Sequence, residues 1–286
     1  AVGMRFDDRV TGDVSRYAKQ AKVIHIDIDA AELNKIIKAD VPVHADAKEA
    51  LKLLTELVQE KQHLVWLNEF TEAKKTEVET LQKSSELSFS SELKMDEVIK
   101  ILSEITKGEA VVVTDVGQHQ MMTARYYNYN KSKSNITSGG LGTMGFALPA
   151  AIGAKFGTPD KTVIAVIGDG GFQMTLQELG TILQSKVEVK IIILNNRFLG
   201  MVRQWQDLFF EKRYSFTEIM SPDFVALAKA YSIESSRIEE RTHLKEALLE
   251  MLNHQGSYLL EVMVAKEENV FPMVPTGASV SEIRLN

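Results

Sequence analysis

The chain has 286 residues, of which 44% are hydrophobic and 25% are charged, a composition typical of globular proteins. Its length exceeds the usual size of one domain, so it predicts at least two units. The net charge of -6 argues against nucleic acid as the main partner. No apolar run reaches the roughly 20 residues that a membrane-spanning helix needs. The absence of cysteine excludes disulfides and thiolate chemistry.

The first 60 residues predict a partial α/β domain. An apolar run predicts a strand at 21–29, followed by one or two helical turns at 30–37 and an amphipathic helix at 44–58. The chain starts with AVGMRFDDRV, without an initiator Met or a signal-peptide pattern, so we expect a piece of a longer protein that begins inside a domain. Residues 61–93, which become rich in charge from 72 onward, predict an exposed linker with some helix.

Residues 94–286 predict the second domain, which includes the C-terminal tail. Continuous Val/Ile runs alternate there with helical patterns, which indicates an α/β fold with a parallel sheet covered by helices on both faces. The expected strands are 110–117, 162–170, 189–196 and 257–265, the last of which closes the sheet. The expected helices are 94–105, the second part of 139–157, 176–184, 222–233 and 243–252.

Three of these strands end in unusual residues. The segments are DVGQHQ (115–120), GDGG (168–171) and NNRFLG (195–200). Ligands of open parallel sheets bind at the carboxyl ends of the strands. The three segments are therefore the first indication of a functional site.

The segment GDGG does not satisfy the dinucleotide fingerprint G-x-G-x-x-G, because position 173 is Gln. Asp169 has two readings: it caps a helix, or it holds a cation between the protein and a phosphate. After Gly170, 24 residues (171–194) precede Asn195 and Asn196, a distance that brings two parallel strand ends side by side. A carboxylate, an amide oxygen and backbone carbonyls suit Mg²⁺, while the glycines leave backbone N–H groups free for a diphosphate.

At this spacing GDG and NN resemble the binding motif for thiamine diphosphate (ThDP). The longer segments 138–154, 168–179 and 195–215 resemble the catalytic subunit of the acetolactate synthase family, of the biosynthetic, FAD-containing type. RFDDRVTG (5–12) and VIHIDID (23–29) resemble its central FAD-binding domain, and PMVPTGAS (272–279) resembles its C-terminal tail. The resemblance covers essentially the whole chain.

The resemblance implies a role for each matching position. Asp169, Asn196 and the backbone oxygen of Phe198 would coordinate Mg²⁺. The residues expected to contact ThDP are Gln118, His119, Gly142, Met144, Gly168, Gly170, Gly171 and Met201. The family often has Ser or Ala in place of Gly171, so a hydroxyl contact is lost. His119 and Met144 have core packing as their alternative, although Met144 matches the residue over which thiamine bends.

The resemblance also implies a substrate channel and a flavin site. Arg9, Val202 and Trp205 would line the channel beside Met201, and Trp205 has an alternative role in a subunit interface. The expected FAD contacts are Gly3, Arg5, Asp7, Asp27, Ile28, Asp46, Ala47, Gly139 and Gly140, with Arg9 in the same loop. FAD would be structural. Without the resemblance, the acidic members of this set read as solvated charges at strand ends.

The implied reaction is ThDP-dependent decarboxylation of pyruvate and ligation to a second 2-oxo acid. Pyruvate would give 2-acetolactate and 2-oxobutyrate would give 2-aceto-2-hydroxybutyrate, in branched-chain amino-acid biosynthesis. The family's activating Glu lies in an N-terminal domain of a partner chain. No Glu of this sequence matches it, so we name no catalytic residue and expect the chain to be inactive alone.

The implied protein is a cytoplasmic homo-oligomer, such as a dimer, with active sites between chains and a possible small regulatory subunit. The nearest alternatives are other ThDP enzymes, of the pyruvate oxidase, glyoxylate carboligase or non-flavin acetolactate synthase type. Another alternative is a non-catalytic module for cofactor binding or oligomerisation. A dinucleotide-dependent dehydrogenase is disfavoured by Gln173.

Overall fold

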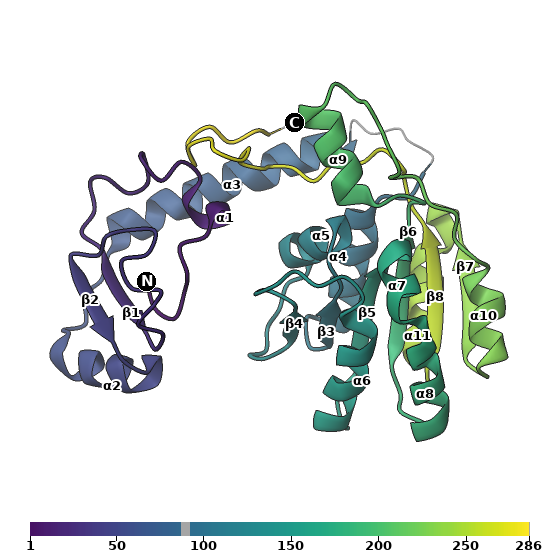
Figure 1. Ribbon diagram of the computed structural model, residues 1–286. Coiled ribbons are helices and arrows are strands. Elements are labelled where there is room, and N and C mark those ends of the chain that lie inside the picture. Colours follow the sequence, from purple (N-terminus) through teal and green to yellow (C-terminus); the bar gives the residue numbers. More distant parts are fainter. Residues whose placement is uncertain (87–91, 286) are drawn as a thin grey trace. The chain divides into compact units, whose positions relative to one another are not determined.

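The computed structural model describes residues 1–86 and 92–285, which form two compact units. The first unit comprises Ala1–Ser88 and Phe271–Asn286, and the second comprises Phe89–Val270 (Figure 1). We expected the C-terminal tail to belong with the domain 94–286. The structure instead groups the tail with the N-terminal residues.

A six-stranded parallel sheet forms the centre of the second unit, in the order β4-β3-β5-β6-β8-β7 (Figure 1). Its strands are β3 (Val111–Thr114), β4 (Asn135–Thr137), β5 (Val163–Gly168), β6 (Lys190–Asn195), β7 (Glu234–Ile238) and β8 (Tyr258–Met263). The prediction that 257–265 closes the sheet was wrong. β8 is an inner strand whose residues are almost all buried, and the edge is the polar strand β7, which its composition did not reveal.

Helices cover both faces of this sheet, which confirms the predicted α/β architecture. The helices are α4 (Met95–Thr106), α5 (Gln118–Tyr126), α6 (Ala147–Gly157), α7 (Asp169–Thr175), α8 (Leu179–Ser185), α9 (Gly200–Phe209), α10 (Phe224–Ala230) and α11 (Leu244–Asn253), with 3₁₀ turns at Leu176–Glu178 and Arg241–His243. One apolar cluster joins α4, α5 and α11 to one face, and a second joins α6, α7, α8 and α10 to the other. The helices α5 and α9 were not expected, because their patterns are weakly apolar or mixed.

The first unit contains the two-stranded parallel sheet β1 (Ile24–Asp27) and β2 (Val41–His44), with the one-turn helix α1 (Asp8–Thr11). The prediction of helical turns at 30–37 was wrong, because this segment forms non-helical turns. Asn34 adopts φ 62° and its side-chain oxygen accepts a hydrogen bond from the N–H of Ala39 (2.9 Å). This left-handed residue interrupts a helix where the apolar pattern alone favoured one.

Two longer helices follow in the first unit. α2 (Ala47–Leu57) confirms the amphipathic helix, and Asp46 caps it by accepting hydrogen bonds from the N–H groups of Lys48 and Glu49. The expected linker 61–93 forms the single helix α3 (Leu64–Glu86), while its residues 87–91 lie outside the described part of the chain. None of the helices in the described residues is both long and apolar enough to cross a membrane.

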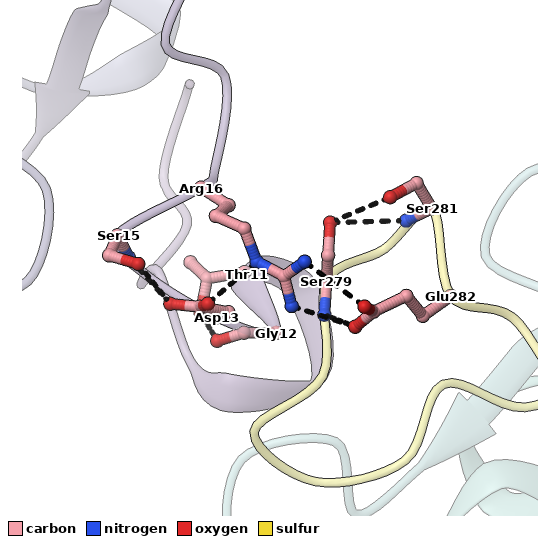
Figure 2. Close-up of polar contacts among 8 residues, drawn as sticks. All are labelled: Thr11, Gly12, Asp13, Ser15, Arg16, Ser279, Ser281 and Glu282. Atoms are coloured by element: carbon pink, nitrogen blue, oxygen red, sulfur yellow. Dashed lines mark hydrogen bonds and ion pairs between the residues drawn. The ribbon is translucent and has the colours of Figure 1, made fainter.

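The C-terminal tail is joined to the N-terminal loop by polar contacts (Figure 2). The Arg16 guanidinium pairs with Asp13 (2.8 Å) and with Glu282 (2.7 Å). The N–H of Asp13 donates to the carbonyl of Ala278 (2.8 Å). Gly12 has φ 54°, and a Cβ there would lie 2.3 Å from the same carbonyl, so the close approach of the tail requires glycine.

Candidate functional site

The three strand ends singled out in the sequence meet at one edge of the sheet. β5 pairs with β3 on one side and with β6 on the other, and Gly168 lies opposite Leu194. A cavity of about 50 Å³ opens at this edge. The expected site residues that line it are Gln118, His119, Met144, Gly168, Asp169, Gly170, Gly171, Asn196, Phe198, Met201 and Val202.

Two candidates of the same group in the second unit are not among the lining residues. Gly142 lies exposed in a turn with φ 62°. Trp205 is half-buried on α9 and its ring packs against Phe209, with 4.9 Å between the centroids. Neither residue contributes to the cavity wall in the described structure.

Asp169 is a buried acid at the start of α7. It is the first residue of the helix, while Gly168 occupies the cap position, so the helix-cap reading does not describe it. Its side chain is only 1% exposed and accepts a hydrogen bond from Ser221 Oγ (3.0 Å). Burial raises the pKa of Asp169 to about 6, and the nearby acid Glu261 adds to this shift. A cation bound at this position would stabilise the carboxylate.

The two consecutive asparagines have different roles. Asn195 turns away from the cavity and donates from Nδ2 to Glu261 Oε1 (2.7 Å). Asn196 is 3% exposed and lines the cavity together with Asp169. Its Oδ1 accepts from the N–H of Phe198 (3.1 Å), which leaves a second lone pair on that oxygen. Asn196 is therefore the asparagine that can join Asp169 in a metal site.

His119 is buried in the cavity wall without a full set of partners. Among the described residues its Nε2 has no hydrogen-bond partner. Burial lowers the pKa of His119 to about 4, so the ring is neutral near pH 7. The ring packs so closely on Gly168 that a Cβ there would lie 2.9 Å from it. An unpaired imidazole nitrogen beside a glycine-lined cavity fits a ligand rich in acceptor oxygens, such as a diphosphate.

The glycines that α7 contributes to the cavity have no room for side chains. A Cβ on Gly170 would lie 2.8 Å from Leu199 Cδ2, and one on Gly171 would lie 1.8 Å from Asp115 Oδ2. Asp115 is fully buried and accepts hydrogen bonds from the N–H groups of Gly145 (3.1 Å) and Ala147 (3.3 Å). Its carboxylate occupies the space that a side chain at position 171 would need, next to the loop that carries Met144.

Three further residues of the site, Asp115, Ser221 and Gln204, were not predicted from the sequence. Asp115 could have been found as an acid at the end of a buried strand, but Ser221 and Gln204 carry no local signal. Gln204 accepts a hydrogen bond from Gln118 Nε2 (3.0 Å), which also donates to the carbonyl of Glu268 (2.8 Å). Both N–H groups of the Gln118 side chain are thus engaged, and only its backbone N–H, at the start of α5, is left to meet a phosphate.

The flavin candidates of the first unit gather around β1 and β2. Asp27 Oδ1 accepts a hydrogen bond from the N–H of Asp29 (2.8 Å). Asp27 lies opposite His44 in the sheet, and His44 precedes the capping residue Asp46 by two positions. The remaining candidates in this unit are Gly3, Arg5, Asp7, Arg9, Ile28 and Ala47. Arg5 and Asp7 line a separate cavity of about 270 Å³, and Arg9 donates to Thr276 Oγ1 (2.8 Å). Gly139 and Gly140 are exposed in the second unit.

Comparison with known protein families identifies both parts of the chain. Residues 115–262, more than half of the sequence, match the family model described as thiamine pyrophosphate enzyme, C-terminal TPP binding domain. The chain belongs to the thiamine pyrophosphate enzyme family. Thiamine pyrophosphate is another name for ThDP, so the expected cofactor class agrees with the family. Residues 1–54 match the central domain of the same enzymes.

Acetolactate synthases are among the curated relatives. The large subunit from Lactococcus lactis is 43% identical over 284 residues, which are 99% of this chain and 48% of that protein. The isozyme 2 large subunit from Escherichia coli is 43% identical over 99% of this chain and 50% of its own length. The chloroplastic acetolactate synthase 1 from Oryza sativa is 40% identical over 100% of this chain and 46% of its own length. The chain thus spans about half the length of the curated relatives it matches.

Proposed function

We propose that this chain provides the diphosphate- and metal-binding part of a ThDP-dependent acetolactate synthase. The observation that carries the proposal is the cavity in which the unpaired Nε2 of His119, the buried carboxylate of Asp169 and the amide of Asn196 surround a glycine-lined helix start. The names of the relatives suggest the activity, and the GDG and NN segments of this chain suggest the positions.

In this proposal Asp169, Asn196 and the backbone oxygen of Phe198 hold Mg²⁺, whose preferred ligands are oxygens. His119 and the first amides of α5 and α7 donate to the diphosphate, because amides in a first helical turn have no acceptor within the helix. ThDP, once bound, supplies the carbon nucleophile and the electron sink for the decarboxylation. Met144, Gly142 and Met201 support the thiamine rings, and Val202 and Trp205 line the substrate channel.

We also propose structural FAD binding by the first unit. The support is the pair of acids at the ends of adjacent parallel strands, Asp27 and Asp46, which suits the hydroxyls of a ribose. Ile28 is 68% exposed next to Asp27 and offers an apolar contact for an adenine. The remaining proposed contacts in this unit are Gly3, Arg5, Asp7 and Ala47.

The substrates of the whole enzyme would be pyruvate and a second 2-oxo acid, either pyruvate or 2-oxobutyrate. The proposed oligomer is a dimer of catalytic chains, with the activating Glu supplied by a partner, so the chain alone would not turn over. A small regulatory subunit is a further proposed partner, and its support is the words "large subunit" in the names of several relatives. The cytoplasmic location stays a prediction, and the plant relatives carry "chloroplastic" in their names.

The proposal is tested by calorimetric titration of the chain with ThDP, with and without Mg²⁺. We expect binding of ThDP that depends on Mg²⁺. We expect Asp169→Ala to weaken this binding more than about 100-fold, because mutation of a residue that only hydrogen-bonds to a metal ligand already lowers metal affinity by about 10- to 100-fold. Asp223→Ala is the control, since this exposed acid caps α10 outside the cavity. Equal affinity of Asp169→Ala and the unaltered chain would overturn the metal assignment.

A further inference from the structure

Three buried carboxamides follow one another from α9 to the cavity. Gln204, Gln118 and Asn196 are each no more than 3% exposed. Gln118 Nε2 donates to Gln204 Oε1 (3.0 Å), and Asn196 Nδ2 donates to Gln118 Oε1 (3.4 Å). Each carboxamide thus meets the next with its donor end against an acceptor end.

The orientation of the first carboxamide is set by the backbone N–H and C=O groups of Val270. Gln204 Oε1 accepts from the N–H of Val270 (2.8 Å), and Gln204 Nε2 donates to the carbonyl of the same residue (3.1 Å). The backbone N–H and C=O of a folded residue cannot exchange places, whereas a carboxamide can rotate by half a turn. The backbone of Val270 therefore fixes which end of Gln204 is the oxygen.

The second carboxamide takes its orientation from the first. Two acceptors, Gln204 Oε1 and the carbonyl of Glu268, face Gln118 Nε2, so the oxygen of Gln118 must point to the opposite side. On that side lie Asn196 and Gly200. A Cβ on Gly200 would lie 2.1 Å from Gln118 Oε1 and 2.8 Å from Asn196 Nδ2, so the contact between the two amides passes over a glycine.

Asn196 is the last member. Gln118 Oε1 attracts its NH₂ group, and the N–H of Phe198 donates to its oxygen (3.1 Å), so both neighbours favour the same orientation. A reversed Asn196 would present an NH₂ group, which repels a cation, in place of the oxygen that binds one.

We infer that Gln204 is a positioning residue for the metal site: through Gln118 it holds Asn196 with its oxygen available to Mg²⁺. This inference rests on the proposed function, because it takes Asn196 as a metal ligand. Gln204 itself does not line the cavity. It acts by hydrogen bonding in a buried network, where a wrongly oriented amide leaves unpaired donors and acceptors.

The test is the Mg²⁺ affinity of Gln204→Met, measured by calorimetry in the presence of excess ThDP. Met has a similar length and no polar end, so Gln118 keeps only the Glu268 carbonyl to orient it, and we expect a loss of about 10- to 100-fold. Gln204→Glu keeps an acceptor toward Gln118 but turns a second oxygen toward the Val270 carbonyl, so we expect a loss smaller than that of Gln204→Met. Gln206→Met is the matched control. Gln206 lies on the same helix and pairs in the same way with the backbone of Ser215, by accepting its N–H (3.0 Å) and donating to its carbonyl (3.1 Å).

Repeating the measurement in an Asn196→Asp variant separates an effect on the orientation of Asn196 from a general loss of structure. In Asn196→Asp both ends of the side chain are oxygen, so Gln204→Met should cause no further loss of Mg²⁺ affinity there. A loss that persists in this background, an equal loss in Gln206→Met, or no loss in Gln204→Met would each overturn the inference while leaving the proposed function intact. Absence of Mg²⁺-dependent ThDP binding by the unaltered chain would overturn the proposed function and this inference with it.

Discussion

The two units use their apolar residues differently. In the second unit Val112 and Ile164 on neighbouring strands are completely buried between the sheet and its helices. In the first unit the apolar stripe of α2 lies at the surface of the described structure, with Leu53 61% and Leu57 80% exposed, and on α3 Val65 is 81% exposed. Amphipathic periodicity predicts helices in both units. In the described structure, the apolar side of these helices is covered by the sheet in the second unit and is exposed in the first. An amphipathic pattern thus determines that a helix forms, but not what packs against it.

The largest contrast is expected from truncating one apolar side chain in each unit. Phe172 is fully buried on α7 and its ring meets Phe224 edge-on, with 5.2 Å between the centroids. Phe172→Ala should lower the free energy of unfolding of the second unit by about 3–5 kcal/mol. Leu57→Ala should change the stability by less than about 0.5 kcal/mol, because Leu57 is 80% exposed. Denaturant unfolding followed by circular dichroism measures both, and similar losses would contradict the contrast between the units.

A second contrast compares two helical glycines of the second unit. Gly171→Ala would place a Cβ 1.8 Å from Asp115 Oδ2, and the hydrogen bonds of Asp115 to two backbone N–H groups resist its displacement. We expect a loss of about 1–3 kcal/mol from this overpacking. A Cβ on Gly153 meets no atom within 4 Å in the described structure. Gly153→Ala should therefore stabilise α6 by up to about 1 kcal/mol, and a thermal melt showing the same sign for both variants would disprove the expectation.

Glu268 is expected to make the free energy of unfolding depend on pH. Burial, together with the nearby Asp96, raises the pKa of Glu268 from 4.5 to about 7, although the N–H of Met95 donates to its carboxylate. The folded unit therefore binds a proton that the unfolded chain has lost, so this stability is fully present below pH 4.5 and is lost as the pH rises through about 7.

Glu268→Gln removes this titration while keeping an acceptor for Met95. We expect the variant to be more stable than the unaltered chain by roughly 1–3 kcal/mol at pH 8 and similar to it near pH 4.5. Guanidinium unfolding at several pH values checks this. A variant with an undiminished pH dependence would show that Glu268 is not the group responsible.

The smallest effect is expected in the first unit, where the tail is held by exposed charges. Glu282→Gln removes the ion pair with Arg16 at 2.7 Å, and its side chain is 52% exposed. Because exposed pairs are screened by salt, we expect only slightly faster hydrogen exchange of the tail amides, and a smaller difference at high salt. Hydrogen exchange measured by mass spectrometry tests this, and an effect that is large or independent of salt would show that the pair is not a surface interaction.

Much of the fold could be predicted because its signals are local. The Val/Ile runs of β3, β5 and β6 and the capped pattern of α2 predict these elements from a few neighbouring residues. The turns at 30–37 and the edge strand β7 could not be predicted in this way. In the first case one left-handed Asn overrides an apolar pattern, and in the second a polar strand is held by pairing with β8.

Asp169 and Asn196 could be named from the sequence as candidate ligands of a metal beside a diphosphate. The order GDG, helix and NN brings Asp169 and Asn196 to neighbouring strand ends, since parallel strands connected by a helix place these ends at one edge. The directions in which the side chains face could not be predicted in this way: Asn195 faces Glu261, Asn196 faces the cavity, and Gln118 faces Gln204. The physical reason is that an amide takes its orientation from donors and acceptors on segments distant in the sequence, which meet only when the chain has folded.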